Sequence, residues 1–207
     1  MWSPQHETLL FPGACSLAVH IVLREIGQAF SLERVDLASH KTEHGDDYYR
    51  LNPKGYVPLL ELDDGFYLSE GPVINQYLCD RAGRVDLMPA PGSMARYRVM
   101  EWQGFINSEL HKGFGGLFNP ALDEAAKRVI GEGLRRRLQW VSSQLQGRPY
   151  LAGEVFSAAD AYLFTVASWA GFLGLDISHC PELQGYLVRL AARPSIQAAL
   201  KAEGLTS

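Results

Sequence analysis

One cysteine of the 207-residue chain stands where a turn gives way to an expected helix. Cys15 follows Phe11-Pro12-Gly13-Ala14, and apolar residues recur at helical spacing from Leu17 to Val22. Unpaired N–H groups and the dipole at a helix N-terminus favour negative charge. This position therefore predicts a lowered pKa for the thiol and thiolate chemistry near neutral pH. The alternative interpretation of Cys15 is a small apolar core residue.

A second candidate is the segment Asn52-Pro53-Lys54-Gly55-Tyr56-Val57-Pro58, which precedes an expected strand. A cis peptide bond at Pro58 would turn the neighbouring backbone N–H and C=O groups outward, where an extended peptide could pair with Val57. The other interpretation is a strand whose start is simply defined by proline. Both interpretations fit the segment.

A third candidate, Ser69-Glu70-Gly71-Pro72, lies between a strand and a helix. N–H groups at the helix start could bind a ligand carboxylate, while Glu70 binds a ligand ammonium group. That pairing suits a zwitterionic amino-acid head. Alternatively, Ser69 or Glu70 only caps the helix.

His111 closes an expected helix in the second half of the chain and could carry a proton near neutral pH. A histidine at that place is also expected from the helix dipole alone. The other histidines lack ligand-like spacing, so no metal site is expected. Ser157 and Asp160 have the spacing of a capping box, which predicts a structural role for both.

The elements that position these residues follow the order βαβαββα in the first eighty residues. Apolar periodicity and turn residues predict strands, helices and a hairpin in this order: Thr8–Phe11, Ser16–Ile26, Phe30–Leu37, Asp46–Leu51, Val57–Leu62, Phe66–Leu68 and a helix from Pro72. This order predicts an α/β layer in which helices pack on a sheet.

The expected domain division uses the proline and glycine residues near position 90. Residues 1–7 are expected to form a disordered extension, 8–83 the α/β domain, 84–92 a linker and 93–207 an all-helical domain. Ser157–Leu173 is apolar on nearly all sides, so it is expected to be the central buried helix.

Composition excludes several classes of function. The net charge of −4 gives no support for a nucleic-acid partner, and no apolar run reaches the ~20 residues of a membrane span. Three widely spaced cysteines suggest neither a disulfide framework nor a metal knuckle. A cytoplasmic protein fits best, with Cys79 and Cys180 as inert helical residues.

These segments together resemble a cytosolic glutathione transferase, specifically the bacterial beta class. Five stretches carry the resemblance: Pro12–Leu17, Gly45–Tyr48, Asn52–Pro58, Glu109–Phe114 and Ala159–Phe164. It implies a thioredoxin-like N-terminal domain followed by an all-helical domain, which agrees with the expected order of elements. It also implies a homodimer, glutathione as co-substrate and no metal.

The resemblance assigns a role to each candidate. Cys15 would contact the glutathione sulfur and could form a mixed disulfide with it, while Ser16 and His111 would assist catalysis. The implied glutathione site comprises Cys15, His40, Val57, Pro58, Ser69, Glu70, Gly71, Ser108, His111 and Lys112. The implied second-substrate pocket comprises Leu10, Phe11, Phe114 and Phe118.

Four positions depart from the family pattern. Leu10 stands where many relatives have a tyrosine, and Gly71 stands where they have a serine. His40 stands at the place of a basic loop residue, for which the adjacent Lys41 could substitute, and Gly104 at the place of a polar residue. Leucine cannot donate a hydrogen bond to sulfur, so Cys15 and Ser16 remain the candidate donors. Weaker glutathione binding or a different pose of the peptide is expected.

The leading functional hypothesis is activation of the glutathione thiol for attack on a small hydrophobic electrophile. One rival is glutathione-dependent disulfide or peroxide reduction, in which Cys15 attacks and glutathione resolves the mixed disulfide. Another is a non-catalytic carrier of hydrophobic ligands on the same fold. The electrophile is not specified, because an aromatic pocket selects little beyond apolar character.

Overall fold

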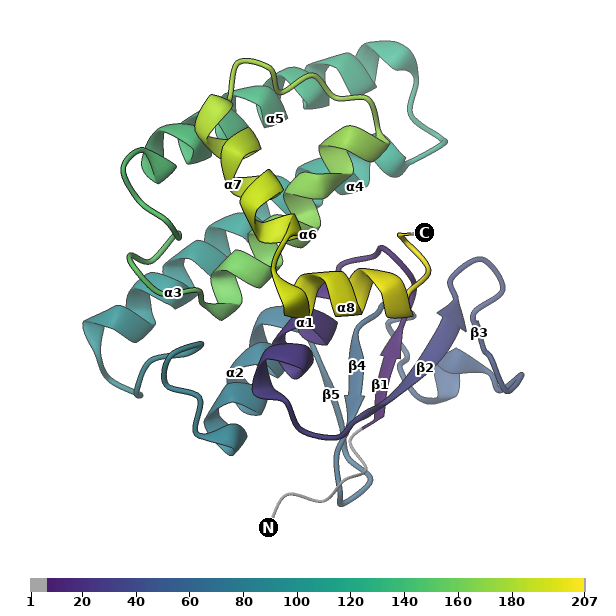
Figure 1. Cartoon of the computed structure of the whole chain (residues 1–207). Coiled ribbons are helices and arrows are strands. Elements are labelled where there is room, and N and C mark those ends of the chain that lie inside the picture. The colour runs from purple at the N-terminus through teal and green to yellow at the C-terminus, as the bar shows by residue number, and fades with distance from the viewer. Residues whose placement is uncertain (1–6, 207) are drawn as a thin grey trace. The chain divides into compact units, whose positions relative to one another are not determined.

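The computed structural model describes residues 7–206, which divide into two compact units (Figure 1). Of these residues, 7–88 and 193–206 make up one unit, called the N-terminal unit, and Pro89–Ala192 make up the other, called the helical unit. Residues 1–6 of the expected extension lie outside the described residues, whereas Glu7 belongs to the first strand. The boundary at Met88 falls inside the expected linker.

A five-stranded mixed sheet organises the N-terminal unit, in the order β3-β2-β1-β4-β5 (Figure 1). β1 pairs in parallel with β2 and antiparallel with β4, and β4 pairs antiparallel with β5. The strand bounds are β1 Glu7–Leu10, β2 Ser31–Asp36, β3 Lys41–Thr42, β4 Leu59–Glu61 and β5 Tyr67–Ser69. The expected thioredoxin-like arrangement is confirmed. The two-residue β3 was not predicted, and the expected helical turn is the 3₁₀ helix η1, Tyr48–Arg50.

Helices α1 (Leu17–Ile26) and α2 (Gly71–Ala82) belong to the same unit. Side chains alternate along β4, so Leu59 and Leu60 face opposite sides of the sheet. Each leucine joins a separate buried cluster. One cluster comprises Leu9, Val35, Tyr48, Val57 and Leu59. The other comprises Val19, Leu23, Leu60, Ile74 and Leu78, from α1, β4 and α2.

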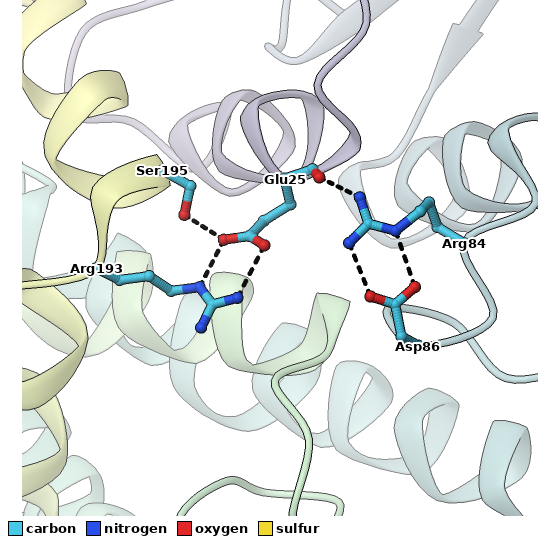
Figure 2. Close-up of polar contacts among 5 residues, drawn as sticks. All are labelled: Glu25, Arg84, Asp86, Arg193 and Ser195. Carbon is cyan, nitrogen blue, oxygen red and sulfur yellow. Dashed lines mark hydrogen bonds and ion pairs between the residues drawn. The ribbon is translucent and has the colours of Figure 1, made fainter.

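The last helix, α8 (Pro194–Ala202), lies along α1 and belongs to the N-terminal unit (Figure 1). The sequence division placed it with the helical domain, so that part of the division differs from the structure. The physical reason is a polar anchor at Glu25, near the end of α1 (Figure 2). Arg193 donates two hydrogen bonds to its carboxylate, at 2.5 and 2.8 Å, and the Ser195 hydroxyl donates a third.

Arg84 extends this anchor to the segment after α2. Its guanidinium donates to the Glu25 carbonyl and to both Asp86 carboxylate oxygens, the latter at 2.8 and 2.7 Å (Figure 2). Burial alone would raise the pKa of Glu25, but the hydrogen bonds from Arg193 and Ser195 and the positive charges outweigh it and lower the pKa. The anchor therefore requires an ionised Glu25.

Glu25→Gln is expected to reduce the free energy of unfolding by roughly 2 kcal/mol at pH 7, because a partly buried charge-assisted pair is lost. Since the folded pKa lies below the usual 4.5, the ionised pair stabilises the fold above pH 4.5, and this contribution is lost as the pH falls. Urea denaturation at pH 7 and below pH 4 measures both effects.

The matched control for Glu25 is Glu101→Gln, because Glu101 forms an exposed pair with Arg98 at 2.6 Å. An exposed pair of this kind contributes about 0.5 kcal/mol or less. Equal losses for the two variants would contradict the role assigned to Glu25.

The helical unit begins with three consecutive helical segments, α3 (Met94–Phe105), the π-helix η2 (Ile106–His111) and α4 (Lys112–Phe118). α5 (Glu124–Leu145), α6 (Ala158–Phe172) and α7 (Pro181–Ala191) complete it. Most residues of α6 are buried, as its apolar sequence predicts. None of the helices formed by residues 7–206 combines the length and apolar character needed to cross a membrane.

Candidate active site

Cys15 lies in the turn that leads into α1, two residues before the helix begins at Leu17. Backbone hydrogen bonds hold this turn: Ala14 N donates to Phe11 O at 3.1 Å, and Ala18 N donates to Cys15 O at 3.2 Å. The Cys15 thiol donates to the carbonyl oxygen of Val57 at 3.2 Å. The structure thus brings together two segments that the sequence singled out separately.

The thiol of Cys15 does not have the lowered pKa that the sequence predicts. Burial raises its pKa to about 11, opposed by the backbone N–H groups of Cys15 and Ser16 and reinforced by the negative charge of Glu70. The prediction requires the cysteine at the helix start itself, whereas α1 begins at Leu17. In the structure the thiol is half-buried and donates to a carbonyl, which stabilises the protonated form.

Two side chains fix the peptide that precedes Val57. The Tyr48 hydroxyl and the Asn52 amide each donate to the carbonyl oxygen of Tyr56 at 2.7 Å. Tyr48 is completely buried, and burial raises its pKa to about 12, so it acts as a donor at neutral pH. The Val57–Pro58 peptide bond is cis, as the interpretation of this segment as a peptide-pairing site required. Neither Tyr48 nor Asn52 was assigned a role from sequence.

Glu70 occupies the position before α2 with φ of 72°, a backbone conformation that non-glycine residues rarely adopt. Its side chain makes no capping hydrogen bond to α2, so the capping interpretation fails for this residue. Its Oε1 instead lies 2.7 Å from Lys54 Nζ. Ser69 ends β5, opposite Leu59.

Gly71, the first residue of α2, lies beside Pro58. A Cβ atom added to Gly71 would lie 3.7 Å from Pro58 Cγ, an ordinary van der Waals distance. Gly71 is therefore close to Pro58, and the charge of Glu70 acts on Cys15. The three candidate segments of the sequence thus lie together in the N-terminal unit. The arrangement offers a thiol donor, the backbone near a proline and a carboxylate.

The structure also describes the other residues of this unit that the sequence assigned to the glutathione site or the second-substrate pocket. Ser16 is buried, and its hydroxyl donates to Phe11 O at 3.2 Å and accepts a hydrogen bond from Phe11 N at 3.3 Å. Leu10 is a fully buried core residue, not part of an open pocket, whereas Phe11 is exposed. His40 Nε2 hydrogen-bonds with the Tyr49 hydroxyl at 3.1 Å, and the two rings stack.

A polar network missed from sequence reaches the Cys15 turn from beyond α8. Glu203 Oε2 accepts a hydrogen bond from Gly13 N at 2.9 Å, and its Oε1 lies 2.8 Å from His20 Nδ1. The side chains of Glu203 and His20 are both buried. Gly13 and Glu203 are 190 residues apart, so no local pattern could indicate this contact.

His111 lies in a continuous helical path at the junction of η2 and α4, not at a helix C-terminus as the sequence suggested. Its Nδ1 lies 2.8 Å from the Tyr162 hydroxyl, which donates to Asn107 Oδ1 at 3.0 Å. Because the tyrosine proton is used on Asn107, His111 must donate from Nδ1.

Aromatic side chains surround this histidine within the helical unit. Trp169 lies 5.2 Å from the His111 ring, and its own ring contacts Phe114 and Phe118 edge-on. Phe118 is exposed, but Phe114 is fully buried, so the expected pocket role of Phe114 is replaced by core packing. Ser108 and Lys112 are exposed.

Asp160 confirms the expected structural role within the same unit. Its carboxylate accepts hydrogen bonds from Leu151 N, Ser157 N, Ser157 Oγ and Tyr186 OH, at 2.7 to 2.9 Å. The expected link between Ser157 and Asp160 is therefore present at the start of α6. Within residues 7–206, no group of three or more His, Cys, Asp or Glu side chains is placed to hold a metal ion.

Comparison with known proteins gives matches over both halves of the chain. Residues 13–81 match the family model described as "Glutathione S-transferase, N-terminal domain", and residues 105–194 match "Glutathione S-transferase, C-terminal domain". A glutathione S-transferase of Escherichia coli O157:H7, GstA, is 46% identical, over 94% of this chain and 96% of its own.

Solved structures give the same result. A glutathione transferase of Methylococcus capsulatus is 50% identical with a TM-score of 0.94, covering 97% of this chain and 100% of its own. A sphingomonad glutathione S-transferase complexed with glutathione is 44% identical with a TM-score of 0.92 and the same coverage. A beta-class enzyme of Sphingomonas chungbukensis has 44% identity and a TM-score of 0.93, again with 97% and 100% coverage.

Proposed function

The chain belongs to the glutathione S-transferase family, and on that premise we propose that it is a beta-class enzyme whose Cys15 donates a hydrogen bond to the glutathione sulfur. The observation that carries this proposal is the contact of the Cys15 thiol with Val57 O, made by a half-buried thiol that stays protonated at neutral pH. When glutathione binds, the S–H group would turn from this carbonyl oxygen to the glutathione sulfur. A protonated thiol stabilises a neighbouring thiolate but is a poor nucleophile itself. The nucleophile is then the glutathione sulfur.

The rest of glutathione has partners in the N-terminal unit. The β4–β5 pairing begins at Leu59, so Val57 lies outside the sheet ladder and its backbone can pair with the cysteinyl part of the peptide. Glu70 would bind the α-ammonium group of the γ-glutamyl residue, and the N–H groups at Gly71 its carboxylate. His40 and Ser69 complete the proposed site in this unit, and the family resemblance adds Ser108 and Lys112 of the helical unit.

The proposed reaction is conjugation with a small hydrophobic electrophile. The glutathione thiolate forms a carbon–sulfur bond, and a leaving group departs with its bonding electrons. The proton lost by the glutathione thiol passes to solvent, and the family resemblance adds His111 as its proton carrier. Phe11 and Phe118 are the exposed aromatic residues proposed for the electrophile side.

Cys15→Ser and Cys15→Ala test this assignment through conjugation of glutathione to 1-chloro-2,4-dinitrobenzene. We expect Cys15→Ser to keep kcat/KM within about fivefold of wild type, because a hydroxyl replaces the donor. We expect Cys15→Ala to lose about 10- to 100-fold, the contribution of a hydrogen bond to a charged group. Equal activity of all three proteins would contradict the donor role.

Intact-mass measurement after incubation with oxidised glutathione separates the rival activities. Conjugation as main activity predicts slow formation of a Cys15 adduct at pH 7.5. Thiol–disulfide exchange predicts instead that the adduct forms within seconds. It also predicts fast reduction of a glutathione mixed disulfide by the wild type and loss of this activity in Cys15→Ser. Neither conjugation nor glutathione binding by calorimetry would favour the carrier of hydrophobic ligands.

Tyr48→Phe is expected to raise the KM for glutathione about fivefold with little change in kcat, because one hydrogen bond to Tyr56 O is lost and the Val57 backbone is less well fixed. Steady-state kinetics at varied glutathione concentration measures the two constants. Tyr56→Phe is the control, because its ring is 70% exposed. A KM shift shared by both variants would argue against the positioning role of Tyr48.

We also propose a homodimer in the cytoplasm, as the family resemblance implies. Cys15, Cys79 and Cys180 form no disulfide bond with one another, which suits a reducing compartment. Light scattering coupled to size-exclusion chromatography measures the oligomeric state, and a mass of one chain would overturn the dimer.

A further inference from the structure

The proposed ammonium-binding carboxylate already has a cationic partner. Lys54 Nζ lies 2.7 Å from Glu70 Oε1, 16 residues along the chain. The backbone of Lys54 is held in place, because its N–H donates to Asn52 Oδ1 at 3.2 Å and the next residue, Gly55, donates to Asn52 O at 2.9 Å. The lysine side chain extends from this fixed turn to Glu70.

This ion pair is poorly suited to a purely structural role. The side chains of Lys54 and Glu70 are 48% and 59% exposed, and exposed pairs contribute little to stability. Glu70 does not cap α2, and its backbone adopts a costly positive φ. Strained residues of this kind are concentrated at ligand sites, which connects Glu70 with binding.

We propose that Lys54 is an internal competitor of glutathione, whose ammonium group occupies Glu70 in the free enzyme and gives way to the α-ammonium group of the ligand. This inference rests on the proposed function. A lysine ammonium and an α-ammonium both present N–H donors and one positive charge, so they compete for the same carboxylate. Binding then exchanges one cation for another instead of pairing a free charge.

The exchange also has a consequence for Cys15, on which the Glu70 charge acts. One positive charge stands beside Glu70 before and after the exchange, so the field at the thiol changes little when glutathione binds. When Lys54 is replaced by a neutral residue, its positive charge beside Glu70 is lost from the free enzyme. The field at the Cys15 thiol would then change when the ammonium group of glutathione binds to Glu70.

Isothermal titration with S-methylglutathione tests the competition, because this ligand has no thiol to react. At low ionic strength we expect Lys54→Gln to bind about two- to fivefold more tightly than wild type, since no cation has to leave. In about 0.5 M NaCl, where charges are screened within a few ångströms, the difference should disappear. Lys201→Gln on α8, which removes an equal exposed charge, should bind like wild type.

A ligand variant isolates the contact. For an S-methylglutathione analogue in which hydrogen replaces the α-amino group, Lys54→Gln and wild type should bind equally, because there is no ammonium group to compete. Lys54→Arg keeps the charge and should bind S-methylglutathione within about twofold of wild type. Urea midpoints equal to wild type establish that the variants are folded.

The outcomes are distinguishable. Weaker or unchanged binding by Lys54→Gln at low ionic strength would overturn the competition, as would a gain that persists for the analogue without the amino group. Failure of wild type itself to bind S-methylglutathione would instead overturn the proposed glutathione site.

Discussion

The Cys15 thiol is expected to react with iodoacetamide about 100-fold more slowly at pH 7.5 than an ordinary cysteine, because its pKa is raised from 9.0 to about 11. Each pKa unit lowers the thiolate fraction tenfold at a pH below both values. The rate should rise about tenfold per pH unit between pH 7 and pH 10 without reaching a plateau. Peptide mass spectrometry measures alkylation of Cys15 separately from that of the buried Cys79 and Cys180.

Glu70→Gln provides the matched variant for this experiment. Its negative charge raises the pKa of Cys15, so neutralising it should lower that pKa and speed alkylation at a fixed pH. Burial, the larger cause, remains in the variant, so the pKa should stay above that of a free thiol. A plateau of the wild-type alkylation rate near pH 8 would contradict a Cys15 thiol that is protonated at neutral pH.

Asp160→Ala is expected to reduce the free energy of unfolding by on the order of 4 kcal/mol, because four donors lose their acceptor inside the helical unit. Two of these donors are backbone N–H groups, of Leu151 and Ser157, which cannot turn away to find water. Urea denaturation followed by circular dichroism measures the loss.

The control for Asp160 is Asp123→Ala. Asp123 also caps a helix, because its carboxylate accepts a hydrogen bond from Ala126 N at 2.8 Å, but it is exposed. Removing such a cap costs about 1 kcal/mol. Similar losses for the two aspartates would show that burial of the network around Asp160 adds nothing to capping.

The fold was largely predictable because its signals are local. Alternating apolar residues, the Asp64-Gly65 turn and Pro72 predicted the strands and helices of the N-terminal unit within a few residues. The sequence did not predict that α8 belongs to the N-terminal unit. Its packing on α1 depends on contacts such as that between Arg193 and Glu25, which are 168 residues apart. The π-helix η2 carries no sequence signal of its own.

In the candidate site, too, the features with local sequence signals were predicted and those that depend on distant contacts were not. Turn and proline residues predicted the neighbourhoods of Cys15, Val57 and Glu70, each at the boundary of an element. The predicted lowering of the Cys15 pKa was wrong, because segments distant in sequence surround the thiol and raise its pKa. A helix N-terminus recognised from local sequence says nothing about those segments. Tyr48 and Glu203 were missed for the same reason: each acts on a loop that only the tertiary structure brings near.

The contact between Gly13 and Glu203 also bears on how the protein is made. A growing chain displays residues 7–88 early, but the carboxylate that holds the Cys15 turn is added only when translation has passed residue 203. Domains usually fold one after another as they leave the ribosome. In this enzyme most of the N-terminal unit is synthesised before the helical unit but is completed after it, so the Cys15 turn acquires its final support only after the helical unit has been synthesised.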